Sequence, residues 1–199
     1  PMTGRELLAG VSHRVLRETL DGECRALTYD SRRVTPGTVF VAMRGARTDG
    51  HDYIHEAAER GAALIVAERE TDDAHVVVEN SRLALAKLAA NFHGQPAQSL
   101  KLIGITGTNG KTSVAFLLRH IFQHAGKRCG LIGTVEYDLG DRVLPATRTT
   151  PESLELHAYF AGMVRAGCEL CVMEVSSHAL VQHRVAGFEF QTTAFASFS

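Results

Sequence analysis

The second half of the chain alternates apolar runs with longer amphipathic stretches, and this pattern restricts its fold more than any other feature. The runs KLIGIT, RCGLIGT and ELCVMEV are strand-like, and the stretches TSVAFLLRHIFQHAG and PESLELHAYFAGMVRAG between them are long enough for helices. Strands alternating with helices of this length form parallel sheets, because a parallel connection needs a crossover of a dozen or more residues. We therefore predict an α/β fold with a parallel sheet over residues 98–199.

The first half of the chain is organised differently. Short apolar runs (TVFVAM, AALIVA, HVVV) are separated by the turn signals PG, RG and DG, with one amphipathic segment, HDYIHEAAERGA, among them. A helical pattern follows from Ser81 to Phe92, and the break HGQPAQS comes after it. We predict a small mixed α/β domain over residues 1–97, followed by a second domain over residues 98–199.

Composition excludes some classes of partner. The 21 Lys and Arg residues nearly balance the 22 Asp and Glu residues, so we expect no nucleic-acid-binding surface, which needs a marked basic excess. No apolar run is long enough for a membrane span, and the N-terminus lacks the basic and apolar regions of a secretion signal. We expect a cytoplasmic protein.

Cys168 and Cys171 form a C-x-x-C pair within CELCVMEV. A redox or zinc pair is one interpretation. However, residues three apart in a strand point to opposite faces, and no second pair or histidine cluster lies nearby to complete a metal site. We therefore expect buried core thiols.

The segment IGITGTNGKTS joins a predicted strand to a predicted helix. The usual phosphate-loop pattern, G-x-x-x-x-G-K-[ST], requires a glycine where Ile105 stands. Even so, glycines at a strand-to-helix turn let backbone N–H groups converge on an anion, and the helix N-terminus adds partial positive charge. We expect Lys111 to neutralise phosphate oxygens and the Thr112 hydroxyl to reach a magnesium ion, which predicts a triphosphate site.

The helix after this loop has apolar residues at positions i, i+3, i+4 and i+7. This spacing predicts one face packed on the sheet, formed by Val114, Leu117, Leu118 and Ile121.

Polar residues follow the predicted strand LCVMEV. Its last acidic residue, Glu174, would lie at the carboxyl edge of a parallel sheet, where such sheets bind ligands, and it is similar to the acid that holds magnesium in P-loop enzymes. A solvated strand end is the alternative. The segment EVSSHALVQHRV lacks a G-x-S-x-G elbow, so we favour substrate binding over hydrolysis. Thr149 and Thr150 precede Pro151; we expect one to cap the next helix and the other to be free for a ligand.

The first domain contributes two polar loops, around Asp30-Ser31-Arg32 and from Gly45 to Gly50. Turn chemistry alone explains them. Their arginines could also bind a diphosphate, because guanidinium groups match phosphate oxygens, although exposed arginines are more often only solvated.

Four motifs occur in order along the chain: DSRRVTPGTVFVAMRGARTDGHDYI, GITGTNGKTS, TRTTPES and EVSSHALVQHRV. With them the chain resembles the Mur ligases, ATP-dependent amide-forming enzymes that assemble the peptide of bacterial peptidoglycan. The resemblance accounts for Ile105, because the family's loop reads G-x-x-G-T-N-G-K-T. It is strongest to the branch that adds meso-diaminopimelate or lysine, as the third amino acid, to UDP-N-acetylmuramoyl-L-Ala-D-Glu. It implies phosphoryl transfer from ATP, with Mg²⁺, to the terminal carboxylate, then attack by an amine on the acyl phosphate.

The resemblance also implies roles for individual residues. Lys111 and Glu174 are the implied catalytic residues, and Thr112 and Glu174 the implied magnesium ligands. The implied contacts, by ligand, are Tyr29, Ser31, Ala46, Arg47 and Thr48 for the UDP-sugar, Gly107, Thr108, Asn109, Gly110, Lys111, Thr112 and Ser113 for ATP, and Thr149, Thr150, Ser176, Gln182 and Arg184 for the muramoyl-dipeptide.

Some parts of the family pattern are missing. Ala196 and Ser197 replace a Thr-Asn pair, and the later Asp-His motif, a carbamylated lysine and the C-terminal domain for the incoming amino acid are absent from these 199 residues. We expect an N-terminal portion of a longer ligase that does not complete the reaction alone. The alternatives are a MurF-type ligase, a folylpolyglutamate-synthetase-type ligase, or a non-catalytic module that binds UDP-muramoyl-peptide or nucleotide. The choice between diaminopimelate and lysine stays open.

Overall fold

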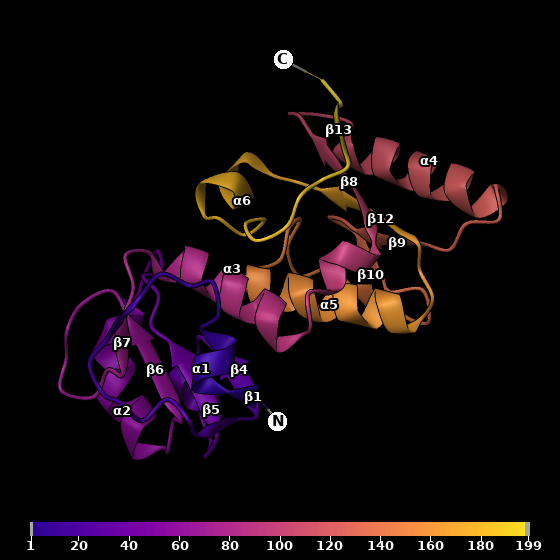
Figure 1. Ribbon diagram of the computed structural model, residues 1–199. Coiled ribbons are helices and arrows are strands. Elements are labelled where there is room, and N and C mark those ends of the chain that lie inside the picture. The colour runs from indigo at the N-terminus through magenta and orange to yellow at the C-terminus, as the bar shows by residue number, and fades with distance from the viewer. Residues whose placement is uncertain (1, 198–199) are drawn as a thin grey trace. The chain divides into compact units, whose positions relative to one another are not determined.

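The computed structural model describes residues 2–197 and divides into two compact units, residues 1–92 and 93–199 (Figure 1). The division falls a few residues before the boundary expected from the sequence. The α/β class predicted for the chain is confirmed, because parallel strands and helices form both units. No helix within residues 2–197 combines the length and the apolar character needed to cross a membrane.

The first unit is built on a five-stranded sheet with strand order β2-β7-β6-β5-β4. Strands β4 to β7 are parallel, and β2 pairs with β7 in the antiparallel direction. Helix α2 packs on this sheet in a core that includes Phe40, Ile54 and Ile65. The elements are β1 Met2–Thr3, α1 Gly4–Leu7, β2 Arg14–Val15, β3 Glu23–Cys24, β4 Ala26–Thr28, η1 Ser31–Arg33, β5 Thr38–Val41, η2 Gly50–Tyr53, α2 Ile54–Glu59, β6 Leu64–Ala67, β7 Val76–Val77 and α3 Ser81–Phe92.

The second unit is built on a six-stranded sheet with strand order β11-β10-β9-β12-β8-β13. Strands β9, β12 and β8 are parallel, as predicted, and β13 also pairs with β8 in the parallel direction. The hairpin β10-β11 adds two antiparallel strands at one edge. The elements are η3 Pro96–Ser99, β8 Lys101–Thr106, α4 Lys111–His124, β9 Cys129–Ile132, β10 Glu136–Asp138, β11 Val143–Pro145, α5 Ser153–Arg165, β12 Leu170–Glu174, α6 Ser177–Val181 and β13 Thr192–Phe195.

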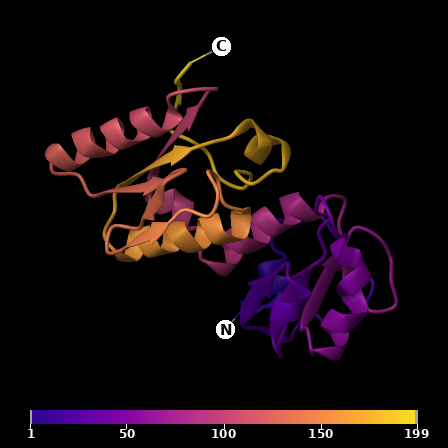
Figure 2. The same ribbon diagram turned by 180° about the vertical axis from the view of Figure 1, so that it is seen from behind.

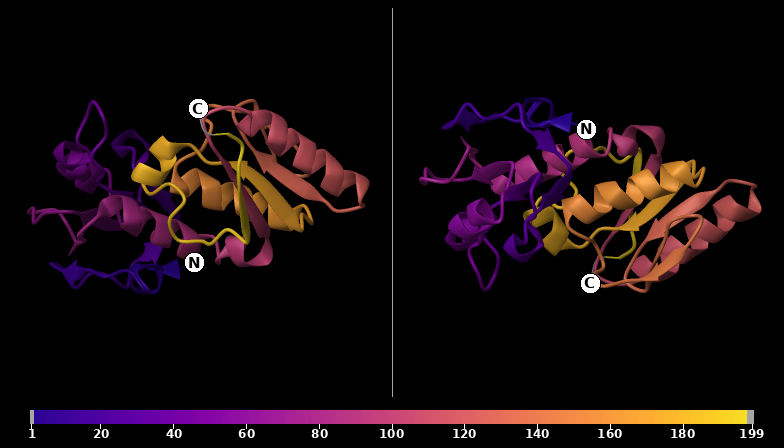
Figure 3. Two further views of the ribbon diagram at one scale, coloured as in Figure 1. Left: turned by 90° about the horizontal axis from the view of Figure 1, so that it is seen from above. Right: turned by 90° about the horizontal axis from the view of Figure 1, so that it is seen from below.

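Alternating strand residues bury the two faces of this sheet against different helices. In β12, Cys171 and Met173 belong to the core shared with α5, whereas Leu170 and Val172 belong to the core shared with α4. Helices α4 and α5 therefore lie on opposite faces, as the views from behind and from below show (Figures 2 and 3). Cys168 is also buried, which confirms the expectation of core thiols.

The predicted buried face of α4 is partly wrong. Leu117 is 59% exposed and Ile121 is 50% exposed, whereas Ala115 is fully buried and Leu118 packs against the same core. The helix is therefore rotated from the expected orientation, and Arg119, on the flank opposite Leu117 and Ile121, pairs with Glu136 and Asp138 of β10. Apolar spacing found the helix but not the direction in which it faces.

Candidate nucleotide and magnesium site

The loop between β8 and α4 has the backbone shape that its glycines permit. Gly107 has φ 128° and Gly110 has φ 80°, conformations that residues with a Cβ rarely adopt. A Cβ on Gly107 would lie 3.0 Å from backbone atoms of Ser197, whose carbonyl accepts a hydrogen bond from the Thr108 amide at 3.2 Å. Gly110 is the N-cap of α4 and has no side chain to accept hydrogen bonds from the first-turn amides, so these remain available to an anion.

Gly104, the first glycine of the segment, belongs to β8 instead of the loop. A Cβ there would lie 3.0 Å from the Phe190 ring, so this glycine permits close packing.

Lys111 lies at the start of α4 with its side chain folded over the loop. Its Nζ donates a hydrogen bond to the Gly107 carbonyl at 2.7 Å. The residue is half-buried. This arrangement places positive charge where the sequence predicted a phosphate.

Glu174 ends β12 beside this loop, and it is fully buried, so the alternative of a solvated strand end is wrong. Its Oε2 accepts hydrogen bonds from the Thr112 hydroxyl at 3.1 Å and the Thr134 hydroxyl at 3.0 Å. Its Oε1 accepts one from the Thr134 amide at 3.1 Å. Because all three partners can donate, the carboxylate fits its charged, acceptor-only form.

The residues around Glu174 fit a magnesium ion. Within residues 2–197, no lysine, arginine or histidine forms an ion pair with this buried carboxylate, and an uncompensated buried charge is costly. Carboxylate and hydroxyl oxygens are the ligands that Mg²⁺ prefers, usually alongside phosphates and waters. The described residues contain no group of three or more acidic, histidine or cysteine ligands. Glu174 and Thr112 would therefore hold the ion together with a phosphate.

The two threonines before α5 do not cap that helix, contrary to our expectation. The N-cap is Glu152, without a side-chain cap, because Pro151 places the helix start later. The buried Thr150 hydroxyl instead donates to the Glu174 carbonyl at 2.9 Å and accepts from the Ser176 amide at 3.2 Å. Thr149 is half-buried, and its hydroxyl lies 3.2 Å from that of Thr134. Thr150 thus fixes the end of β12, whereas Thr149 stays closer to the surface.

Ser176, Gln182 and Arg184 come together through α6. The Ser176 hydroxyl accepts a hydrogen bond from the Ala179 amide and caps this helix. Arg184 is buried; its Nη1 donates to the Thr150 carbonyl at 2.8 Å and its Nη2 to Gln182 Oε1 at 2.6 Å. The structure therefore gathers four of the five residues predicted for the muramoyl-dipeptide, Thr150, Ser176, Gln182 and Arg184, into one hydrogen-bonded group.

The residues predicted to contact UDP are in the first unit. Ser31 is buried, with its hydroxyl 3.3 Å from Glu56 Oε2, and Tyr29, two residues before it, is half-buried. Residues 46–48 are exposed. Their loop is anchored by Asp49, whose carboxylate accepts from the His51 amide at 3.0 Å, and this hydrogen bond lowers the Asp49 pKa to about 2.

Sequence reasoning missed Thr134 and Glu152. Thr134 lies two residues beyond the carboxyl end of β9, so the rule that identified Glu174 would also have identified it. Buried Glu152 lies 3.3 Å from Arg184 and 2.9 Å from Arg148, measured from its Oε1. No local signal relates Glu152 to Arg184, because they are far apart in sequence.

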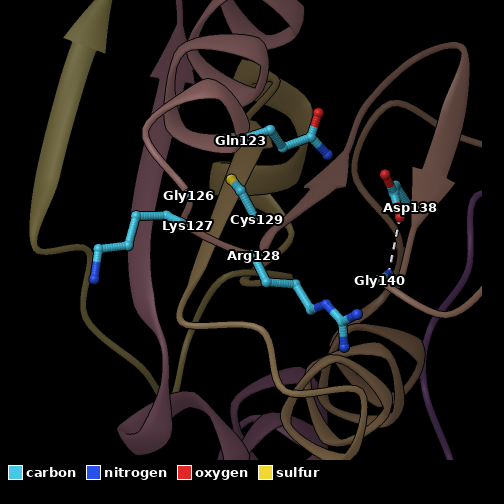
Figure 4. Close-up of a pocket in the computed structure, with 7 residues that line it drawn as sticks. All are labelled: Gln123, Gly126, Lys127, Arg128, Cys129, Asp138 and Gly140. Atoms are coloured by element: carbon cyan, nitrogen blue, oxygen red, sulfur yellow. Dashed lines mark hydrogen bonds between the residues drawn. The ribbon is translucent and has the colours of Figure 1, made fainter.

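A cavity of about 300 Å³ occurs elsewhere in the second unit, at the end of α4 remote from the loop (Figure 4). The main charged groups on its wall are already paired: Lys127 with Glu169, and Asp138 with Arg119. Arg128 donates to the Ala166 carbonyl. None of the predicted site residues lines this cavity, whose lining is Gln123, Gly126, Lys127, Arg128, Cys129, Asp138 and Gly140.

Comparisons with solved structures agree with this fold. A structure of UDP-N-acetylmuramoyl-L-alanyl-D-glutamate--2,6-diaminopimelate ligase superposes with a TM-score of 0.79 at 21% identity, covering 100% of this chain and 40% of that one, which supports the fold. A MurF ligase from Thermotoga maritima in complex with ADP superposes with a TM-score of 0.52 at 33% identity, covering 77% of this chain and 32% of that one.

Sequence comparisons identify the family. The UDP-N-acetylmuramoyl-L-alanyl-D-glutamate--2,6-diaminopimelate ligase of Caldanaerobacter subterraneus subsp. tengcongensis is 43% identical over 98% of this chain, which spans 41% of that protein's length. Residues 105–199 match the family described as Mur ligase middle domain, and residues 23–93 match the Mur ligase family, catalytic domain. The chain therefore belongs to the Mur ligase family.

Proposed function

We propose that this chain provides nucleotide and sugar-nucleotide binding for an ATP-dependent amide ligase of peptidoglycan precursor synthesis. Its substrate would be UDP-N-acetylmuramoyl-L-Ala-D-Glu, with ATP and Mg²⁺. The names of its relatives state 2,6-diaminopimelate, and we propose that amino acid in preference to lysine as the residue added. The observation that carries the proposal is the buried Glu174 carboxylate, held by the Thr112 hydroxyl directly beside the glycine loop.

The chain's own groups suit phosphoryl transfer, which depends on positioned charge more than on a protein nucleophile. ATP, when bound, would supply the phosphoryl group. The free amides at the start of α4 would bind phosphate oxygens, and Lys111 would leave the Gly107 carbonyl to neutralise them. Thr112 and Glu174 would hold the metal ion.

The arrangement around Arg184 supports a role in binding the muramoyl-dipeptide. Its guanidinium group is shared between Gln182, Glu152 and the Thr150 carbonyl, which holds α6 and the start of α5 in fixed positions. The Thr149 hydroxyl lies near the surface of the same region and can contact a ligand. Exposed Arg47 in the first unit is the proposed partner of the UDP diphosphate.

The test is a pair of calorimetric titrations, with Mg-ADP and with UDP, on wild type, Lys111→Ala and Arg47→Ala. We expect Lys111→Ala to weaken only Mg-ADP and Arg47→Ala to weaken only UDP, each by about tenfold, because each variant removes one charge-assisted contact. Arg142→Ala, which removes an exposed arginine beside β11, is the matched control and should change neither affinity.

A third titration, with UDP-N-acetylmuramoyl-L-Ala-D-Glu, should give tighter binding than UDP. Equal affinity for the two would contradict the proposed dipeptide site. Binding of a folate in place of the muramoyl compound would overturn the choice of substrate class.

A further inference from the structure

Thr134 contacts the Glu174 carboxylate at both oxygens. Its amide donates to Oε1 at 3.1 Å, and its hydroxyl donates to Oε2 at 3.0 Å. The neighbouring Gly133 permits this close approach, because a Cβ at this position would lie only 2.6 Å from Oε1. The chain beyond β9 is therefore closely fitted to the carboxylate of Glu174.

The Thr134 hydroxyl has two acceptors within reach. A threonine hydroxyl has one proton, so Thr134 can donate either to Glu174 or to Thr149, whose Oγ1 lies 3.2 Å away. The carboxylate is the stronger acceptor, so the Thr134 proton belongs on Glu174. Thr149 is the second acceptor within reach of the same hydroxyl. The Thr134 hydroxyl therefore lies between the Glu174 carboxylate and the Thr149 hydroxyl, within hydrogen-bonding distance of both.

Thr112 donates to the same carboxylate oxygen from the other side. A metal ion would be bound through a lone pair of the Thr112 oxygen, which leaves the Thr112 proton able to donate to Glu174. The two hydrogen bonds from Thr134 hold the carboxylate from the side of β9. Residues that orient a metal ligand in this way commonly change metal affinity when they are replaced.

We propose that Thr134 is a positioning residue, which orients Glu174 for magnesium and connects it to Thr149 on the substrate side. This role rests on the proposed function. Thr134 is itself exposed, so its replacement leaves no buried cavity.

The test measures ADP affinity by calorimetry, in magnesium and in EDTA, for wild type, Thr134→Val, Thr134→Ser and Thr192→Val. Valine keeps the shape and the amide but removes the hydroxyl. We expect the magnesium-dependent gain in ADP affinity to be about tenfold smaller in Thr134→Val than in wild type. The ADP affinity in EDTA should be unchanged. Serine should restore the gain. Thr192→Val makes the same chemical change on an exposed residue of β13 and should behave as wild type.

The outcomes separate the two proposals. A magnesium-dependent gain in Thr134→Val equal to that of wild type would overturn the positioning role alone. An equal loss in magnesium and in EDTA would also overturn it, since that result indicates a general effect on the loop. Wild type without any magnesium-dependent gain would overturn the proposed function, and the role of Thr134 with it.

Discussion

Two polar regions of the second unit differ in what surrounds their charged side chains. At the loop corner, which comprises residues 107–112, Thr134 and Glu174, a fully buried carboxylate is surrounded by hydroxyl and amide donors. Around the cavity, at the other end of α4, acidic and basic side chains pair directly, as in Arg119 with Asp138 at 3.0 Å. Ion pairs therefore compensate the charged side chains around the cavity. Among the described residues, the Glu174 carboxylate at the loop corner has no such ion pair.

This difference separates structural charge from charge that awaits a ligand. A buried ion pair satisfies both partners within the chain, so it needs nothing from solution. A buried carboxylate without a cation is costly, and a fold retains it where another species supplies the charge. The loop corner is therefore a better candidate for function than the cavity.

Replacing Glu174 by glutamine tests the loop corner and should give the largest effect. We expect the magnesium-dependent gain in ADP affinity to fall by about a hundredfold, because the change removes the carboxylate that we propose as a direct metal ligand. We expect the free energy of unfolding to stay within about 1 kcal/mol of wild type, because the hydroxyls of Thr112 and Thr134 can rotate to accept hydrogen bonds from the new amide. Calorimetry and urea unfolding measure the two quantities.

Glu169→Gln is the matched control, since this carboxylate is half-exposed and pairs with Lys127. It should change neither quantity. Strong destabilisation by Glu174→Gln would mean that the buried carboxylate is structural, and the contrast between the two regions would fail.

Replacing Arg119 by methionine tests the opposite region. The side chains of Glu136 and Asp138 are only 26% and 15% exposed, and the change leaves them without their cation. We expect a loss of about 2 kcal/mol in the free energy of unfolding, from urea titration, with unchanged ADP affinity. Lys127→Met removes a more exposed pair and should cost less than about 1 kcal/mol. Equal losses in the two variants would contradict this assignment.

The sequence predicted the parts of the candidate site that depend on residues adjacent in the chain. Lys111 and Thr112 follow the glycine loop, and Glu174 ends an apolar strand, so motif and strand position identify all three. Thr134 was missed although it follows the predicted strand RCGLI, and only its contact with Glu174 depends on β9 lying next to β12, a pairing that strand order along the chain does not give.

Two predictions were wrong because contacts between distant parts of the chain decided the outcome. The spacing of α4 predicted its existence, but its packing against the sheet buries Ala115 and leaves Leu117 exposed. Thr150 was expected at a helix cap, but its hydroxyl bonds to the end of β12. Local rules predicted the elements, and tertiary contacts assigned their side chains.

His157 is a second buried titratable side chain, and it can be compared with Glu174. Within the described chain neither ring nitrogen has a hydrogen-bond partner, and the ring lies against Phe160 and Phe188. Burial, with a smaller contribution from nearby His93, lowers the pKa of His157 to about 4. Unlike Glu174, this group is kept in its neutral form.

The consequence is a pH-dependent stability with a definite sign. Below the unfolded-state pKa of about 6.5, the unfolded chain binds a proton that the folded chain does not, so stability is lost as pH falls from about 6.5 toward 4. Between pH 7 and 5.5, wild type should lose roughly 1 kcal/mol more than His157→Phe in urea unfolding. His55→Phe should change the slope in the opposite direction, because hydrogen bonding to Asp73 raises the pKa of that exposed histidine. The same pH dependence in wild type and His157→Phe would mean that His157 is protonated, with a partner, in the folded protein.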